Sequence, residues 1–137
     1  MYDKILLPTD GSEKMAKVID NAVNLAEKYN SILHTLFVVD TRYADLLTGE
    51  RGLEASEKMG KKAIKEVENE AKKKTIEITK NIVKGIPAQE IIKYADENKI
   101  DLIVIGTHGK TGLNEYLLGS VAERVLRHSN VPILLTR

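Results

Sequence analysis

The sequence predicts an α/β fold in which a parallel sheet carries helices on both faces. Short apolar runs typical of buried strands alternate along the chain with segments whose apolar residues recur every three or four positions, as in helices. Strict alternation of strand and helix favours a parallel sheet covered on both sides. At 137 residues the chain has about the length of one domain. We therefore expect residues 1–137 to form a single doubly wound domain.

The first strand is expected at residues 5–7, an apolar run that a turn at residues 8–12 brings to an end. Ser12 is placed to cap the helix that follows. That helix has an apolar stripe at three- and four-residue spacing: Met15, Val18, Ile19, Ala22, Leu25, Ala26 and Tyr29.

The next segments predict a central strand, a helix and an edge strand. Residues 32–39 are apolar, residues 40–52 form a polar loop, and a second helix follows with an apolar face: Met59, Ala63, Ile64, Val67 and Ala71. The third strand, within residues 76–83, begins by alternating apolar and polar residues. One of its faces is therefore expected to meet water, which indicates an edge position.

The last part of the chain supplies two helices and two strands. Pro87 fits the first turn of the third helix, because its missing N–H would be unpaired there anyway. Residues 102–105 form the fourth strand, which Gly106 ends, and residues 131–135 form the fifth. Ser120 begins the fourth helix, whose inward residues are expected to be Val121, Val125 and Leu126.

Composition excludes several classes of function. The chain has no cysteine, which excludes disulfides, thiolate zinc sites and cysteine nucleophiles and suits the reducing cytoplasm. Its net charge is +1, and the lysines at residues 61–74 are interleaved with glutamates, so we expect no nucleic-acid partner. No apolar run is long enough for a signal peptide or a membrane span, so no membrane association is expected.

Two segments have the chemistry of a ligand site. In an open parallel sheet, ligands lie beyond the carboxyl ends of strands whose connections leave towards opposite faces. Residues 8–12 follow the first strand, and residues 106–120 follow the fourth with four glycines and a helix start. Glycine backbone and a helix N-terminus form a phosphate cradle without basic side chains. The alternative is that the glycines only make turns and that Ser120 and Glu123 form a capping box.

Two common phosphate motifs do not fit this loop. Gly109, Lys110 and Thr111 resemble the end of a Walker A loop, but Val104 stands where that motif needs glycine. The spacing of the loop glycines also differs from the dinucleotide-binding fingerprint.

The spacing does resemble another motif. Gly106, Gly109 and the pair Gly119-Ser120 are separated by two and nine residues, which is similar to the G-x2-G-x9-G-(S/T) loop of ATP-binding universal stress proteins. The resemblance extends over the chain, through residues 5–12, 85–87, 101–106 and 131–135. It implies a universal-stress-protein-like nucleotide-binding domain with an open five-stranded parallel sheet in the order 3-2-1-4-5. It also implies a role in the stress response, a homodimer, and ATP bound between strands one and four.

The resemblance also implies which residues bind. Three residues would face the adenosine, two would pack near the base or ribose, and five would surround the ribose and phosphates. The residues that would face the adenosine are Pro8, Thr9 and Asp10, and those near the base or ribose are Val38 and Ile105. The residues around the ribose and phosphates would be Gly106, Gly109, Gly119, Ser120 and Val121. Mg²⁺ or Mn²⁺ would be bound by the phosphates, with Asp10 the only motif carboxylate nearby. His108 lies within the loop and is a further candidate for a phosphate contact, whereas His34 and His128 are expected to serve the fold.

These observations predict a cytoplasmic ATP-binding switch, in which the nucleotide biases a surface that an unknown protein partner reads. The alternative is a slow ATPase or phosphotransferase. Phosphoryl transfer needs a group that positions the nucleophile and a charge that stabilises the moving phosphoryl. Asp10 and Lys110 are the only nearby candidates, and neither has an evident partner, so no catalytic residue is assigned. An adenylate-forming enzyme is disfavoured, because the first turn reads Thr-Asp-Gly-Ser instead of Ser-Gly-Gly-x-Asp-Ser.

The fifth strand predicts a homodimer. By the strand order it lies at an edge of the sheet, yet it is apolar at Val131, Ile133, Leu134 and Leu135. An exposed apolar edge invites pairing with another chain. Antiparallel pairing of two copies about a two-fold axis would cover it.

Overall fold

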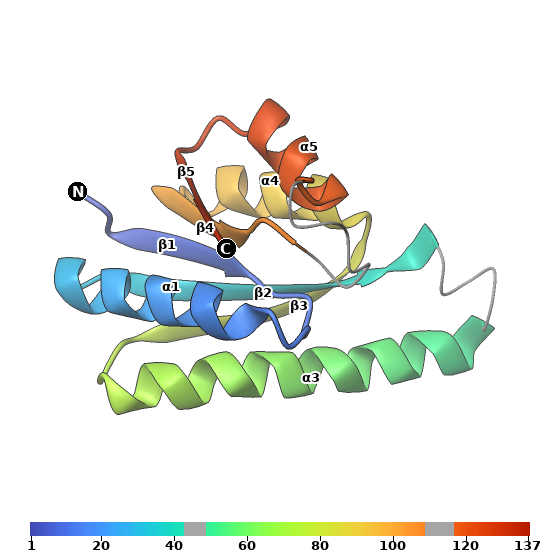
Figure 1. The fold of residues 1–137 in the computed structure, drawn as a ribbon. Coiled ribbons are helices and arrows are strands. Elements are labelled where there is room, and N and C mark those ends of the chain that lie inside the picture. Colours follow the sequence, from blue (N-terminus) through green and yellow to red (C-terminus); the bar gives the residue numbers. More distant parts are fainter. Residues whose placement is uncertain (43–48, 109–116) are drawn as a thin grey trace.

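Figure 1 shows the computed structural model, which describes residues 1–42, 49–108 and 117–137. Its five strands are β1 (Lys4–Pro8), β2 (Ile32–Asp40), β3 (Ile78–Gly85), β4 (Leu102–Gly106) and β5 (Ile133–Thr136). Its helices, in the described part of the chain, are α1 (Met15–Tyr29), α3 (Gly49–Lys73), α4 (Pro87–Glu97) and α5 (Ser120–His128). The strands form one parallel sheet in the order β3-β2-β1-β4-β5. The expected fold class and strand order are confirmed.

The core lies on both faces of the sheet. Ile5 and Leu7 of β1 pack with α1 on one face, where Val67 of α3 joins them, whereas Leu6 packs with α4 and α5 on the other. All three β1 side chains are fully buried. Figure 1 shows the same arrangement, with α1 and α3 on one side of the sheet and α4 and α5 on the other.

β3 and β5 are the two edges of the sheet. Along β3 half-buried and exposed residues alternate from Thr79 onward, which confirms the edge position expected for it. In β5, Ile133 and Leu135 pack into the cluster beneath α4 and α5, whereas Leu134 points away and is 38% exposed.

The structure corrects the expected start of the second helix. α3 begins at Gly49, ten residues before Met59, so the expected loop at residues 40–52 is partly helical; residues 43–48 lie outside the described residues. Among residues 49–58 only Leu53 is named with an apolar cluster, beside Phe37 and Val39. With so few inward apolar residues, this stretch has no helical period for the sequence to reveal.

The expected cap of α1 is wrong, and the capping box considered as an alternative at α5 does not form. Lys14 stands at the N-cap of α1 with no side-chain bond, and Ser12 contributes only its carbonyl, which accepts from the Met15 N–H at 3.1 Å. At α5 the N-cap is Gly119, again without a side-chain bond. The Glu123 carboxylate pairs instead with Arg127 at 3.1 Å, so Ser120 and Glu123 do not form the alternative capping box.

Three expected inward residues face water. Tyr29, Met59 and Leu126 are each more than 40% exposed. In α5 the buried residues are Ala122 and Val125, and Val121 packs beside them as expected. A helix that covers a sheet buries only the residues of its inner face, and these three residues lie outside that face.

The backbone of α3 lies close to the sheet at Gly60. A Cβ atom placed there would lie 2.6 Å from Cδ1 of Phe37, a buried residue of β2. Real Cβ contacts are longer, so only glycine allows the helix backbone to rest on this ring. Gly60 therefore sets the distance between α3 and β2.

We expect Gly60→Ala to lower the free energy of unfolding by about 1–2 kcal/mol. Overpacking costs about 1–3 kcal/mol, and replacing a helical glycine by alanine regains up to about 1 kcal/mol. Urea unfolding monitored by circular dichroism measures the difference. Lys61→Ala, at the exposed neighbouring position, should change stability by less than about 0.5 kcal/mol. A Gly60→Ala variant as stable as the wild type would contradict this packing.

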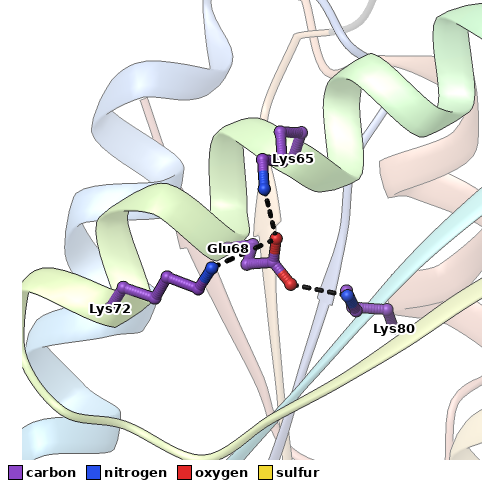
Figure 2. A network of polar contacts seen from close by, with 4 residues as sticks. All are labelled: Lys65, Glu68, Lys72 and Lys80. Carbon is purple, nitrogen blue, oxygen red and sulfur yellow. Dashed lines mark hydrogen bonds and ion pairs between the residues drawn. The ribbon is translucent and has the colours of Figure 1, made fainter.

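A second contact holds α3 to β3. Figure 2 shows Glu68, 8% exposed, with three lysine ammonium groups around its carboxylate. Oε1 lies 2.9 Å from Nζ of Lys65 and 3.8 Å from Nζ of Lys72, and Oε2 lies 2.5 Å from Nζ of Lys80 on β3. The hydrogen bond from Lys80, followed by that from Lys65, lowers the pKa of Glu68 from 4.5 to about 2.

This cluster predicts an acid-sensitive part of the stability. Since the pKa of Glu68 is lower in the folded than in the unfolded state, its stabilisation is complete above pH 4.5 and is lost as the pH falls towards 2. We expect Glu68→Gln to be less stable than the wild type at pH 7 and the difference to shrink across this window. Urea titrations at several pH values measure it. Glu70→Gln, which removes the exposed pair with Lys73, should show little of this dependence; a constant gap between Glu68→Gln and the wild type would refute the assignment.

Candidate functional site

The sheet has a reversal between β1 and β4. These neighbours pair in parallel, with Ile5 opposite Leu102 and Leu6 opposite Ile103. The chain leaves β1 for α1 on one face and leaves β4 towards α5 on the other. The carboxyl ends of β1 and β4 therefore form a topological switch point, which is where open α/β sheets bind ligands.

The turn after β1 is held by its own side chains. The Thr9 N–H donates to the Leu36 carbonyl at 2.9 Å, which keeps the turn beside β2. The Gly11 N–H donates to Thr9 Oγ1 at 3.2 Å, and the Ser12 N–H donates to Asp10 Oδ1 at 2.9 Å. Pro8 and Thr9 are buried and Asp10 is half-buried. Asp10 thus has a local role in shaping the turn, with its second carboxylate oxygen bonded to no described residue.

Two backbone hydrogen bonds of Thr107 fix the segment after β4. The Thr107 N–H donates to the Thr136 carbonyl of β5 at 2.9 Å, and the Thr107 carbonyl accepts from the Gly119 N–H at 2.7 Å. This second bond brings Gly106 and Gly119 to the same end of the sheet although they are far apart in sequence. Gly109 and Lys110 lie outside the described residues.

α5 begins at this end of the sheet. Gly119 is buried at its N-cap, Ser120 is exposed and Val121 is half-buried. No side chain of the described residues caps the helix, so within this part of the chain the first N–H groups of α5 have no side-chain partner. The positive end of the helix dipole adds to these donors, and together they favour an anion.

Val38 and Ile105 border the same end of the sheet. β2 continues from Leu36, the partner of Pro8, to Asp40, so Val38 lies beyond the end of β1. The Val38 and Ile105 side chains both belong to the apolar cluster beneath α4 and α5. They place apolar side chains near the carboxyl ends of β2 and β4, on the same face of the sheet.

Gly106 has a packing role of its own. A Cβ atom at this position would lie 3.1 Å from Cγ2 of Val18 in α1. That contact is tight, so glycine lets α1 lie close against the end of β4. The alternative interpretation of Gly106, as a structural residue, is therefore supported whether or not it also contacts a ligand.

The three histidines differ in their surroundings. His34 is buried, with Nδ1 2.7 Å from the Tyr94 hydroxyl, and desolvation lowers its pKa. His128 ends α5 and is exposed. His108 has Nδ1 2.9 Å from Thr107 Oγ1, and its buried Nε2 has no hydrogen-bond partner among the described residues. An unpaired buried nitrogen beside the switch point strengthens His108 as a candidate ligand contact.

The sequence did not reveal one polar pair at the carboxyl end of β2, because Asp40 was expected in a loop. Arg42 donates to Asp40 Oδ1 from its backbone N–H and its Nε, both at 3.1 Å, and to Oδ2 from Nη2 at 2.8 Å. The side-chain hydrogen bonds from Arg42 hold the pKa of Asp40 below its ordinary value. The spacing Asp-x-Arg directly after an apolar strand was the available signal.

No group of three or more potential metal ligands occurs in the described ranges, 1–42, 49–108 and 117–137. The helices described here include none that is long and apolar enough to cross a bilayer. A groove lies between α1 and α3, and Gly11 and Ser12 of the turn after β1 contribute to its lining.

Fold and site together define an α/β protein with a helix N-terminus and a buried turn at the switch point of its sheet. Residues 1–137 match the Universal stress protein family model. The protein belongs to the universal stress protein family.

Named relatives agree with this assignment. The chain is 37% identical to the universal stress protein MJ0531 of Methanocaldococcus jannaschii, covering all of this chain and 83% of that one. The structure of the universal stress protein UspA from Lactobacillus plantarum is similar with a TM-score of 0.88, at 28% identity over 99% of this chain and 98% of that one. A universal stress protein in complex with cAMP matches with a TM-score of 0.75, at 26% identity over 99% and 97% of the two chains.

Proposed function

We propose that this protein binds ATP beyond the carboxyl ends of β1 and β4 and acts as a nucleotide-dependent regulatory switch in the cytoplasm. The observation that carries the proposal is that the N-terminus of α5, which no described side chain caps, and the Thr9–Ser12 turn both lie at the carboxyl ends of the neighbouring strands β1 and β4. The start of α5 would supply N–H donors for phosphate, and the Thr9–Ser12 turn would border the space into which a nucleoside extends.

The roles of the residues follow from their positions. Gly119, Ser120 and Val121 would hold phosphate through backbone N–H groups and the Ser120 hydroxyl, with Gly106 and Gly109 letting the loop approach closely. Pro8, Thr9 and Asp10 would contact the adenosine, between the apolar side chains of Val38 and Ile105. The relative that binds cAMP supports an adenine nucleotide as the ligand class.

A divalent ion would reach this site with the phosphates. The second carboxylate oxygen of Asp10 is the one motif oxygen available to it among the described residues, and such an oxygen suits Mg²⁺ or Mn²⁺. The ion would neutralise phosphate charge and would not need a set of protein ligands of its own.

A switch is favoured over a slow ATPase or phosphotransferase. Among the described residues, the Asp10 carboxylate is bonded only to the Ser12 backbone N–H, and no described side chain pairs with it to form a catalytic unit. Steady phosphate release in the presence of Mg²⁺, lost in an Asp10→Asn variant, would favour the enzyme instead. In a switch, the nucleotide would bias a surface that a protein partner reads.

Ser120→Asp tests the phosphate cradle. A carboxylate in the first turn of α5 interacts favourably with the helix dipole, so the free energy of unfolding should stay equal or rise by up to about 1 kcal/mol. The same charge repels phosphate, so ATP affinity should fall by at least about tenfold, whereas adenosine affinity should not change. Isothermal titration calorimetry measures both ligands.

Gln89→Glu is the matched control. It places the same added charge in the first turn of α4, at an exposed position on a different helix. ATP affinity should be unchanged there. Undiminished ATP affinity in Ser120→Asp, or an equal loss in Gln89→Glu, would argue against the cradle.

We also propose a homodimer through β5, the edge strand formed around Val131, Ile133, Leu134 and Leu135. Leu134 is 38% exposed on an edge that no other described strand covers. A second copy, paired antiparallel about a two-fold axis, would bury it.

Leu134→Lys should convert that dimer into a monomer that still binds ATP, because two lysines would face each other near the two-fold axis. Sedimentation equilibrium at micromolar concentration measures the mass. The control variant Leu126→Lys, which changes an exposed residue of α5, should remain dimeric. A monomeric wild type would overturn the proposed dimer.

A further inference from the structure

A groove of about 1060 Å³ runs between α1 and α3, on the face of the sheet away from α5. Apolar side chains line it from both helices: Ala16, Ile19, Met59 and Ala63. Met59 was expected in the core but is 44% exposed, so the floor of the groove offers apolar surface to a partner. Methionine side chains adapt easily to the shape of a bound apolar residue.

The rim of this groove is acidic. Four carboxylates line it against two lysines: Glu13, Asp20, Glu66 and Glu70, with Lys17 and Lys62. The formal charge of the rim is therefore −2, although the whole chain carries +1. In the described part of the chain only Glu70 of these carboxylates is in an ion pair, with Lys73. The other three are available to cations from outside.

We propose that this groove docks an amphipathic helix of a partner protein whose polar face is basic. Figure 1 shows α1 and α3 lying side by side along one face of the sheet, so a third helix could rest in the channel between them. Such a helix would place apolar residues at positions i, i+3, i+4 and i+7 on the floor. Its lysines and arginines would meet the carboxylates of the rim.

The size of the groove favours a helix over a small molecule. Pockets for drug-sized ligands hold about 300–1,000 Å³ and bury most of the ligand. This groove, at about 1060 Å³, is slightly larger than that range and is bounded by two helices. A rod of matching length fills such a shape better than a compact ligand.

Charge would direct a basic helix to the groove between α1 and α3 and away from a second groove beside α3. A second groove, of about 390 Å³, lies on the other side of α3, between that helix and β3. Lys61, Lys65 and Lys80 line it, with Glu68 as the one acidic residue. The two sides of α3 thus carry opposite charge, and this difference would select both the partner and its position.

The groove touches the turn at the proposed nucleotide site. A Cβ at Gly11 would lie 3.3 Å from Cβ of Ala63 and 3.7 Å from Cγ of Met59, so the turn packs against the groove floor. Ser12 also lines the groove, and its buried Oγ has no hydrogen-bond partner among the described residues. A nucleotide held at Thr9 and Asp10 would therefore change helix docking. This coupling rests on the proposed function, whereas docking itself does not.

The test uses two fluorescein-labelled amphipathic peptides of roughly 15 residues, long enough to form helix. Both carry leucine at helical spacing; the polar face of one is lysine and that of the other glutamate. Fluorescence anisotropy with the full chain should show the lysine peptide binding at least about tenfold more tightly. Equal binding of the two peptides, or no binding of the lysine peptide, overturns the proposal.

Variants locate the binding surface. Met59→Gln, which removes apolar surface from the floor, and Glu66→Lys, which reverses a rim charge, should each weaken the lysine peptide several-fold. Leu126→Gln and Glu97→Lys are the matched controls, exposed on α5 and α4, and should bind as the wild type does. Losses as large in the controls as in the groove variants would overturn the assignment. So would a wild-type dimer that Met59→Gln dissociates, since a second copy would then occupy the groove.

The same titration repeated with ATP separates the two proposals. ATP binding is measured by calorimetry in parallel, and ATP should change peptide affinity by several-fold. If ATP does not bind but the lysine peptide does, the proposed function fails and docking stands. If ATP binds and leaves peptide affinity unchanged, the coupling fails.

Discussion

The burial of β1 on both faces is the constraint from which the arrangement of the other elements follows. Ile5, Leu6 and Leu7 have no exposed surface, and β1 is paired along both edges, to β2 and to β4. Successive side chains of a strand point to opposite faces. Both faces of the sheet must therefore be covered, and the chain covers one with α1 and α3 and the other with α4 and α5.

The candidate site is a consequence of the same arrangement. Because β1 and β4 are parallel neighbours, their carboxyl ends lie at one edge of the sheet. Because α1 and α5 cover opposite faces, the connections diverge there, and the bond between Gly119 and Thr107 holds the start of α5 at the divergence. Backbone donors then gather at one place without a cluster of basic side chains, in keeping with a net charge of only +1.

α3 shows how a surface helix is positioned by a few contacts. Gly60 rests on the Phe37 ring, and the nearly buried carboxylate of Glu68 binds Lys80 of β3. Together with the buried apolar face of α3, these two contacts hold the helix over β2 and β3, and a groove remains between α3 and α1. The residues that line the two sides of α3 differ in sign of charge, so the helix presents an acidic groove and a basic one. The geometry of the fold thereby creates surface chemistry that lies outside the strand-end site.

The sequence by itself determined the fold class, the place of β3 at an edge and the two segments at the switch point. Each depends on a local pattern: apolar runs, alternation along β3, and glycines after β4. The caps of α1 and α5, the start of α3 and the exposure of Met59 and Leu126 were decided only by the tertiary structure. Whether Ser12 caps a helix depends on where the turn is held, and a bond from Thr9 to Leu36 of another strand holds it. Local sequence patterns carry no information on such contacts, because they join segments that only the folded chain brings together.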